Sequence, residues 1–335
     1  MKKILSIALC VLMLVTALTA CGAKKPADDN KGDNNTPAAA VKFGAAVYVS
    51  APTATDATED KAGQGSVDVT VAAVTVDKDG KIVACDLDTM QNKVTYTTEG
   101  KAVANAEFKS KRELGDAYNM VAYGGAVQEW YKQTDAFEAL IVGKTVAEVK
   151  ALVIEGNKGN DAVVNAGCTI MIHEFVGAIE KAVANAKAEV AADATVKATL
   201  HTAQTCTDAT EEKAGTNQVE VYGFGAALKD GKVLSADSDC AQVKFTFDIA
   251  GKSTFDASKA VQTKREQGDA YGMVAYGGSA KEWYAQADAF DAACEGKTGA
   301  EIAGLMAEDY KGVDSLKSAG CTIYVSGFVA AASKI

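Results

Sequence analysis

Alternating and apolar segments predict a β-hairpin in the first part of the chain. Residues 67–76 (VDVTVAAVTV) are rich in β-branched residues and partly alternate between apolar and polar positions, which is typical of a strand. The next five residues, DKDGK, have the composition of a turn, and residues 82–87 are largely apolar again. We therefore expect two antiparallel strands, and residues 93–98 predict a further extended segment.

Helical periodicity follows these strands. Residues 129–140 place their large apolar side chains at helical spacings. Residues 145–153 begin with Thr145 and carry Glu148 three positions later, the pattern of a capping box. Residues 174–186 predict a last amphipathic helix. Together these segments predict an α+β fold in which a small antiparallel sheet is flanked by helices.

The same order of segments occurs a second time, at an offset that stays between 151 and 153 residues. The matching segments are DATEDKAG at 56–63 with DATEEKAG at 208–215, KRELGDAYNMVAYGG at 111–125 with KREQGDAYGMVAYGG at 264–278, EWYKQTDAF at 129–137 with EWYAQADAF at 282–290, and AGCTIMI at 166–172 with AGCTIYV at 319–325. A period of about 150 residues is the size of a domain and is much longer than a solenoid repeat. We therefore predict two tandem copies, over residues 41–187 and 196–335, joined by a linker at 188–195.

The N-terminus has the pattern of a secretory signal. Two lysines precede residues 4–18, an almost wholly apolar run that is too short to span a bilayer comfortably. The run ends in the small-residue sequence LTA, directly followed by Cys21, and this is similar to a lipobox. We therefore predict a lipoprotein signal peptide at residues 1–20 and a lipid anchor on Cys21, which places the protein on the extracytosolic face of the cell membrane. A retained transmembrane anchor is the alternative.

Composition and charge predict a flexible tether followed by a folded, acidic remainder of the chain. Residues 21–40 are rich in Lys, Asp, Asn, Pro and Ala and hold no large apolar residue, so they predict a flexible tether. The whole chain is 48% hydrophobic and 23% charged, as expected of a chain that folds. Its net charge of -10 becomes -12 when the two lysines of the signal peptide are removed. This acidic balance argues against nucleic acid or anionic lipid as a partner.

Several kinds of catalytic and metal site are excluded. The two histidines, His173 and His201, do not occupy matching positions, so a histidine-based triad or metal site repeated in both copies is excluded. The sequence has no P-loop, no GxGxxG motif and no paired CxxC, and we expect no metal. Of the cysteines that follow Cys21, only Cys168 and Cys321 occupy matching positions. Because a duplicated domain would be expected to duplicate its bridges, free thiols are favoured over disulfides.

The duplicated polar segments resemble a known family. A hairpin with DGKI, then KxELGDxYxM, then EWYxQxxAF, then GKT, then a small-Gly-small-Thr turn before a last helix is similar to the FMN-binding domain of flavinylated extracytosolic proteins. The resemblance covers both copies nearly end to end, and a lipoprotein with two such domains resembles the PplA-type lipoproteins of Gram-positive extracellular electron transfer. In that family an ApbE-type FMN transferase joins FMN to a threonine hydroxyl through a phosphoester bond.

The resemblance implies covalent FMN at Thr169 and Thr322. The usual acceptor sequence is Ser-Gly-Ala-Thr, and both copies read Ala-Gly-Cys-Thr, which departs at two positions but keeps the residues small. Glycine before the threonine would let the backbone approach the phosphate, and a helix starting just after it would offer free N–H groups. The residues assigned to attachment are Gly167, Cys168 and Thr169 in the first copy and Gly320, Cys321 and Thr322 in the second.

Other duplicated side chains could bind the rest of the cofactor. Basic residues could neutralise the phosphate, and aromatic residues could stack on the isoalloxazine ring. The alternatives are a solvated charge pair for the basic residues and core packing for the tryptophans. The basic candidates are Lys111, Arg112, Lys264 and Arg265, and the aromatic candidates are Tyr118, Trp130, Tyr271 and Trp283.

The resemblance implies an electron carrier rather than an enzyme with its own substrate. FMN in each copy would accept electrons from a membrane quinone oxidoreductase and pass them to extracellular acceptors. The implied partners are the cell membrane through the lipid anchor, the ApbE-type transferase, the membrane donor and the extracellular electron acceptors. A cofactor-free solute-binding or surface-interaction lipoprotein is the alternative function.

Overall fold

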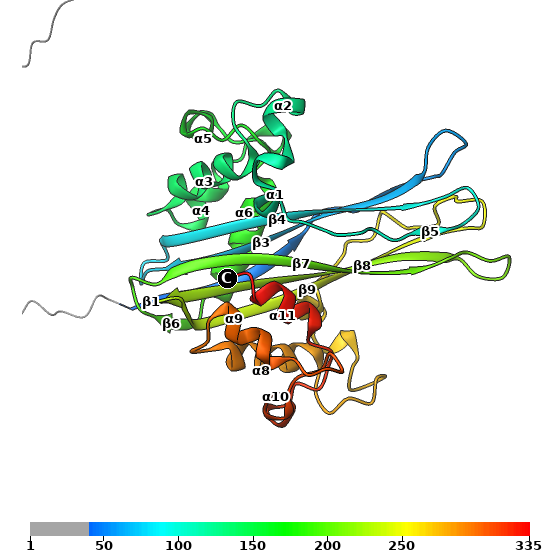
Figure 1. The fold of residues 1–335 in the computed structure, drawn as a ribbon. Helices are drawn as coiled ribbons and strands as arrows, with labels where there is room; N and C mark the ends of the chain where they lie inside the picture. The colour runs from blue at the N-terminus through cyan, green and yellow to red at the C-terminus, as the bar shows by residue number, and fades with distance from the viewer. Residues whose placement is uncertain (1–39) are drawn as a thin grey trace, which may run out of the picture. The chain divides into compact units, whose positions relative to one another are not determined.

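The structure, a computed structural model, describes residues 40–335 (Figure 1). The predicted signal peptide, the lipidation residue Cys21 and the predicted tether up to residue 39 lie outside the described residues. The fold is α+β with antiparallel sheets, as predicted. One sheet forms from the first half of the chain and a second sheet from the second half.

The first sheet is built around a long hairpin. β3 (Gly63–Val76) and β4 (Ile82–Tyr96) pair antiparallel, which confirms the predicted hairpin. The extended segment predicted at 93–98 is mostly the continuation of β4 rather than a separate strand. β1 (Val41–Val49) lies on the other side of β3. The short strands are β2 (Thr53–Thr55), β5 (Ala102–Val103) and β6 (Ala188–Val190), and the sheet order is β5-β4-β3-β1-β6 with β2 on β3.

The second sheet repeats this hairpin with one flanking strand. β8 (Gly215–Lys229) and β9 (Lys232–Phe247) pair antiparallel, and β7 (Thr195–Thr207) pairs with β8. The strand order is therefore β7-β8-β9, which matches β1-β3-β4 of the first sheet. Within the segment predicted as a linker, β6 adds to the first sheet through pairing with β1.

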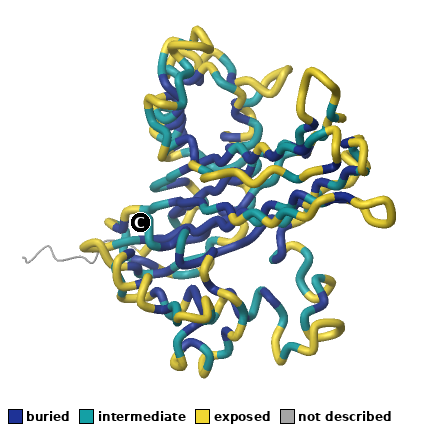
Figure 2. The backbone as a smooth tube through the Cα atoms, turned by 45° about the vertical axis from the view of Figure 1, so that its right-hand side comes forward, coloured by how far each residue is buried: buried dark blue, intermediate teal, exposed yellow. Residues whose placement is uncertain are grey.

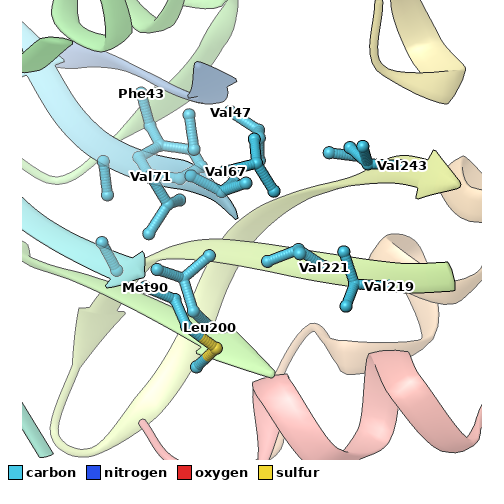
Figure 3. Close-up of a cluster of buried hydrophobic side chains, with 14 of the residues drawn as sticks. Phe43, Val47, Val67, Val71, Met90, Leu200, Val219, Val221 and Val243 are labelled. Carbon is cyan, nitrogen blue, oxygen red and sulfur yellow. The ribbon is translucent and has the colours of Figure 1, made fainter. Parts of the chain in front are cut away.

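The two sheets pack face to face around a common apolar core. Figure 3 shows side chains of both sheets in this core, among them Val47 and Val71 of the first and Val219 and Val221 of the second. The sheets approach closely where β8 carries glycine, because a Cβ atom on Gly225 would lie 2.2 Å from the Cβ of Ala45. The two halves of the chain therefore share one core.

Helices cover the outer face of each sheet (Figure 1). The helices of the first half are α1 (Lys111–Leu114), η1 (Gly115–Tyr118), α2 (Met120–Gly124), α3 (Trp130–Ile141), α4 (Val146–Lys150), η2 (Glu155–Asn157), α5 (Asp161–Ala166) and α6 (His173–Asn185). α3 and α6 confirm the helices predicted at 129–140 and 174–186. α4 has the predicted capping box between Thr145 and Glu148 but ends at Lys150, three residues earlier than predicted.

The helices of the second half lie on the outer face of the second sheet. They are α7 (Lys264–Gln267), η3 (Gly268–Tyr271), α8 (Trp283–Cys294), α9 (Gly299–Ile302), η4 (Ala303–Leu305), α10 (Asp314–Ala319) and α11 (Ser326–Ala332). Figure 2 shows the strands buried at the centre and the exposed segments mostly in outer loops. Within residues 40–335, no helix combines the length and the apolar character needed to cross a membrane.

Candidate functional site

Thr169 lies in the short segment between α5 and α6. α5 begins after the N-cap Asn160 and ends at Gly167, whose φ of 106° is a left-handed conformation that favours glycine. The next side chain, Cys168, is fully buried, whereas Thr169 is exposed. Gly167 thus ends the helix and turns the chain so that the threonine faces outwards.

A buried glutamine on α3 fixes this threonine. The backbone N–H and the hydroxyl of Thr169 both donate to Oε1 of Gln133, at 2.8 and 3.0 Å. Nε2 of Gln133 donates in turn to the carbonyl oxygen of Gln128 at 2.8 Å. Because the hydroxyl proton is used in this bond, the oxygen keeps its lone pairs as an acceptor or a nucleophile.

Thr169 lines a cavity of about 450 Å³, a volume within the range of small-molecule sites. The cavity lies between β3, the segment from α1 to the start of α3, and the segment around Thr169. Its lining combines aromatic, apolar and charged side chains. They include Asp68, Gln91, Lys111, Tyr118, Met120, Trp130, Lys158, Met171, His173 and Glu174.

Lys111 lies at the buried side of this cavity. Its Nζ atom is 3.4 Å from Oδ2 of Asp68 and 5.5 Å from the ring centroids of both Tyr118 and Trp130. The capping box of α1, formed by Ser110 and Glu113, fixes the start of the helix that carries Lys111. The structure thus brings three predicted side chains, Lys111, Tyr118 and Trp130, together beside Thr169.

Arg112 does not line this cavity, although it follows Lys111 directly. Its guanidinium lies 2.7 Å from Asp135, 2.5 Å from Glu138 and 3.7 Å from Asp86. Arg265 has the matching arrangement, at 2.6 Å from Asp288, 2.7 Å from Asp291 and 3.5 Å from Asp237. Both arginines therefore bind carboxylates within the protein, and the structure does not place Arg112 in the lining of the Thr169 cavity.

The tryptophans are mainly core residues. Trp130 is 3% exposed and packs edge to face on Phe175, with ring centroids 5.7 Å apart. Trp283 is also 3% exposed and packs on Phe328 at 5.4 Å. Part of the Trp130 side chain still lines the cavity, and Tyr118 beside it is half-buried.

The second half repeats the arrangement around Thr322. The N–H and hydroxyl of Thr322 donate to Oε1 of Gln286 at 2.9 and 3.0 Å, and Gly320 has the same φ of 106°. Lys264 lies 3.2 Å from Oε1 of Glu220. Its Nζ atom is 5.3 Å from the ring of Tyr271 and 5.5 Å from that of Trp283. Cys321 is fully buried, as Cys168 is.

The two sites differ where α6 and α11 begin. His173 and Glu174 of the first half correspond to Ser326 and Gly327 of the second. The ring of Tyr222, on β8, lies against Gly327, and a Cβ atom at that glycine would be 2.2 Å from Cε2 of the tyrosine. The Tyr222 hydroxyl donates to Oε2 of Glu220 at 3.1 Å.

The expected helix N-terminus does not lie directly at the threonine. α6 begins at His173, four residues after Thr169, and the N–H of Thr169 is already bonded to Gln133. The side-chain cations of Lys111 and the exposed Lys158 are therefore better placed than a helix end to meet an anion. Lys158 was not among the predicted residues, because it lies in a loop without a motif.

Two further pairs were also missed by the sequence analysis. Gln133 and Gln286, which hold the threonines, stand at the same place in the duplicated EWYxQ segment. Glu129 in that segment accepts hydrogen bonds from the N–H groups of Met120 and Val121, at 2.9 and 3.1 Å. Glu282 makes the matching bonds in the second half. The duplicated polar residues were a signal that could have found all four.

The cysteines of the described residues are free, and four of them are buried: Cys168, Cys240, Cys294 and Cys321. Burial raises the pKa of both Cys168 and Cys321 to about 11, so these thiols remain protonated beside the threonines. Between residues 40 and 335, no group of three or more His, Cys, Asp or Glu side chains is arranged to hold a metal ion.

The first site fits a flat anionic ligand in its chemistry. The lining offers aromatic and apolar side chains for a ring system and the threonine hydroxyl for attachment. Its lysines, Lys111 and Lys158, could meet a phosphate, and two carboxyl groups, Asp68 and Glu174, also line the cavity. His173 is part of the cavity lining, and its buried Nδ1 atom has no hydrogen-bond partner among the described residues. Comparison of the chain with protein-family models, curated proteins and solved structures found no match.

Proposed function

We propose that this protein is a membrane-anchored extracytosolic flavoprotein made of two tandem FMN-binding copies. Each copy carries FMN in a phosphoester bond, on Thr169 or Thr322, and the protein relays electrons from a membrane quinone oxidoreductase to extracellular acceptors. The observation that best supports this proposal is the Thr169 hydroxyl, which is exposed, held by Gln133 and open to a cavity of about 450 Å³.

The residues of the first site have distinct roles in this proposal. Lys158 and Lys111 offset the negative charge of the phosphate, while Tyr118 and Met120 contact the ring system. Gln133 keeps the threonine in one rotamer. The flavin, when bound, supplies the electron-transfer chemistry. Covalent attachment suits an exported protein, because a dissociated cofactor would be lost by dilution.

The proposed location depends on the N-terminal segment. Signal cleavage before Cys21 and lipidation of this cysteine would anchor the protein on the outer side of the cell membrane. Residues 21–40 would then separate the folded body from the lipid surface. An ApbE-type transferase working in the same compartment would load FMN on both threonines.

Intact mass spectrometry tests the proposal directly. The protein is produced with an ApbE-type FMN transferase, and we expect a yellow product that has gained two FMN groups. Thr169→Ala and Thr322→Ala should each remove one group, and the double variant should be colourless. Thr98→Ala, at an exposed turn, is the matched control and should keep both groups.

The alternative is a cofactor-free lipoprotein that binds a solute or a partner at its surface. The cavity beside Thr169 is also large enough for a small solute. A colourless protein of unmodified mass, produced together with an active transferase, would contradict flavin attachment and favour this alternative.

A further inference from the structure

We propose that the two threonine sites are electrostatically unequal, and that Glu174 makes the first site respond to pH, so that flavins at Thr169 and Thr322 have different midpoint potentials. This inference rests on the proposed function. It concerns the charged side chains that surround each site.

Three of the charged positions are the same in both halves. Asp68 on β3 corresponds to Glu220 on β8, and Lys111 corresponds to Lys264. The loop residue Lys158 corresponds to Lys311. These positions give each site one carboxylate and two ammonium groups, so they create no difference between the sites.

The fourth position differs in charge. Glu174 on α6 lines the cavity beside Thr169. Its counterpart is Gly327, against which the ring of Tyr222 is packed. Burial raises the pKa of the Tyr222 hydroxyl, so this residue stays neutral at all physiological pH values. The first site therefore has a second carboxyl group where the second site has a phenol.

The surroundings of Glu174 place its titration near neutrality. Burial, with repulsion from Asp68 on β3, raises the pKa of Glu174 to about 7, although Lys111 on α1 lowers it. Burial lowers the pKa of the neighbouring His173, so its imidazole is neutral at pH 7 and above. The cavity lining adds the amide Gln91 on β4 and the ammonium of Lys158. The second site also has the ammonium of Lys281 beside Gly320, where the first site has the amide of Gln128 beside Gly167, and this difference does not change with pH in this range. As pH rises through about 7, the first site gains one negative charge that the second site does not gain.

A nearby negative charge opposes the addition of electrons to a flavin. The first site should therefore have the lower midpoint potential above neutral pH, which makes the second site the better electron acceptor. Below neutral pH the difference should shrink, because protonated Glu174 carries no charge.

The test uses variants that keep one flavin each. Thr322→Ala retains the first site and Thr169→Ala the second, and intact mass confirms their loading. Spectroelectrochemical titrations at about pH 6 and about pH 8.5 bracket the titration of Glu174. We expect the potential of the first site to fall more between these pH values than that of the second. If the midpoint potentials of the two fully loaded variants changed equally between these pH values, the inference would be overturned and the proposed function would remain intact.

Charge substitutions identify the responsible residue. Glu174→Gln in the Thr322→Ala background should remove the additional pH dependence of the first site. Glu180→Gln, on the exposed side of the same helix, is the control and should leave it unchanged. The reverse change places Tyr222→Thr and Gly327→Glu in the Thr169→Ala background. It should give the midpoint potential of the second site the same additional pH dependence. If the midpoint potential of the first site changed with pH in Glu174→Gln as it does without this substitution, the inference would be overturned.

The free protein provides a separate measurement. NMR titration of the Glu174 carboxyl carbon should show a transition near neutral pH, whether or not flavin is attached. A transition near the ordinary glutamate value would overturn the inference. Absence of any flavin in the mass spectrum would instead refute the proposed function, so the two failures are distinguishable.

Discussion

At the scale of single residues, Gln133 and Gln286 set the orientation of the two threonines. Each glutamine is fully buried, and its Oε1 accepts two hydrogen bonds from one exposed threonine. A buried amide with both ends bonded has a single orientation, whereas an exposed threonine alone has several rotamers. The glutamine therefore fixes the direction of the hydroxyl, as the proposed attachment of FMN would require.

We expect Gln133→Leu to reduce FMN loading at Thr169 while loading at Thr322 stays complete. The substitution keeps the side-chain size but removes the acceptor, so the hydroxyl loses its fixed direction. The loss of these bonds should also lower the free energy of unfolding by about 1–2 kcal/mol. Intact mass and urea unfolding measure the two effects.

The mirror variant Gln286→Leu is the control, and it should impair only the second site. Equal loading of both threonines in either variant would show that the glutamine does not position the hydroxyl.

The sequence analysis singled out the two threonines but missed the side chains that hold them. The duplicated Gly-Cys-Thr segment marked Thr169, and the structure places it on the surface beside a cavity. Arg112 was assigned to the same site as Lys111 because the two are adjacent, but they lie on different sides of α1 and Arg112 binds Glu138. Sequence adjacency cannot show which of two neighbouring side chains a short helix turns towards a cavity.

At the scale of elements, two buried aspartates fix where short helices begin. Asp88 does this for α1 and Asp239 for α7. Oδ1 of Asp88, on β4, accepts a hydrogen bond from the N–H of Arg112 at 3.2 Å. Oδ1 of Asp239, on β9, accepts the matching bond from Arg265 at 3.1 Å. Burial raises the pKa of each aspartate to about 6, against the opposing effect of these hydrogen bonds.

These raised pKa values predict a pH-dependent stability. A folded-state pKa above the ordinary value of 3.8 means that the folded protein binds the proton more tightly than the unfolded chain. The contribution of Asp88 to stability should therefore fall as pH rises from about 4 to about 6 and stay constant above that range. The slope for one carboxyl is at most about 1.4 kcal/mol per pH unit.

Urea unfolding between about pH 4 and pH 7 measures this effect. Asp88→Asn should show a shallower decline than the unmodified protein, and the difference should be confined to this range. Asp60→Asn, at an exposed loop, is the control and should keep the original slope. An unchanged slope in Asp88→Asn would contradict the assigned pKa.

Local patterns predicted the main elements but not all their partners. The valine-rich segment and the DKDGK turn predicted the hairpin of β3 and β4, because strand and turn signals lie within one stretch of sequence. β6 was missed within the predicted linker, since three residues of pairing with β1 leave little periodic pattern. Long-range pairing depends on tertiary contacts that a local pattern does not contain.

At the scale of the whole molecule, the shared core makes the two halves dependent on each other. Val47 and Val71 of the first sheet are 2% or less exposed because the second sheet covers them. A period of about 150 residues suggests a domain that folds alone. The packing of the sheets predicts that the first half needs the second.

We expect residues 40–190 expressed alone to expose the inner face of the first sheet. The exposed valines should cause aggregation or dimerisation and binding of a hydrophobic dye, because apolar patches of this kind are unfavourable in water. Light scattering and dye fluorescence test this, with residues 40–335 as the soluble control. A monomeric first half with cooperative unfolding and no dye binding would contradict it.

The placement of the helix layers also separates the two threonines. α5, which precedes Thr169, covers one side of the paired sheets, and α10, which precedes Thr322, covers the other (Figure 1). Thr169 follows the first of these helices and Thr322 the second, so the two sites lie on opposite sides of the paired sheets. In the proposed function, a reductant docked over one threonine would leave the other open to an oxidant, so the protein could receive and deliver electrons without turning around between the two encounters.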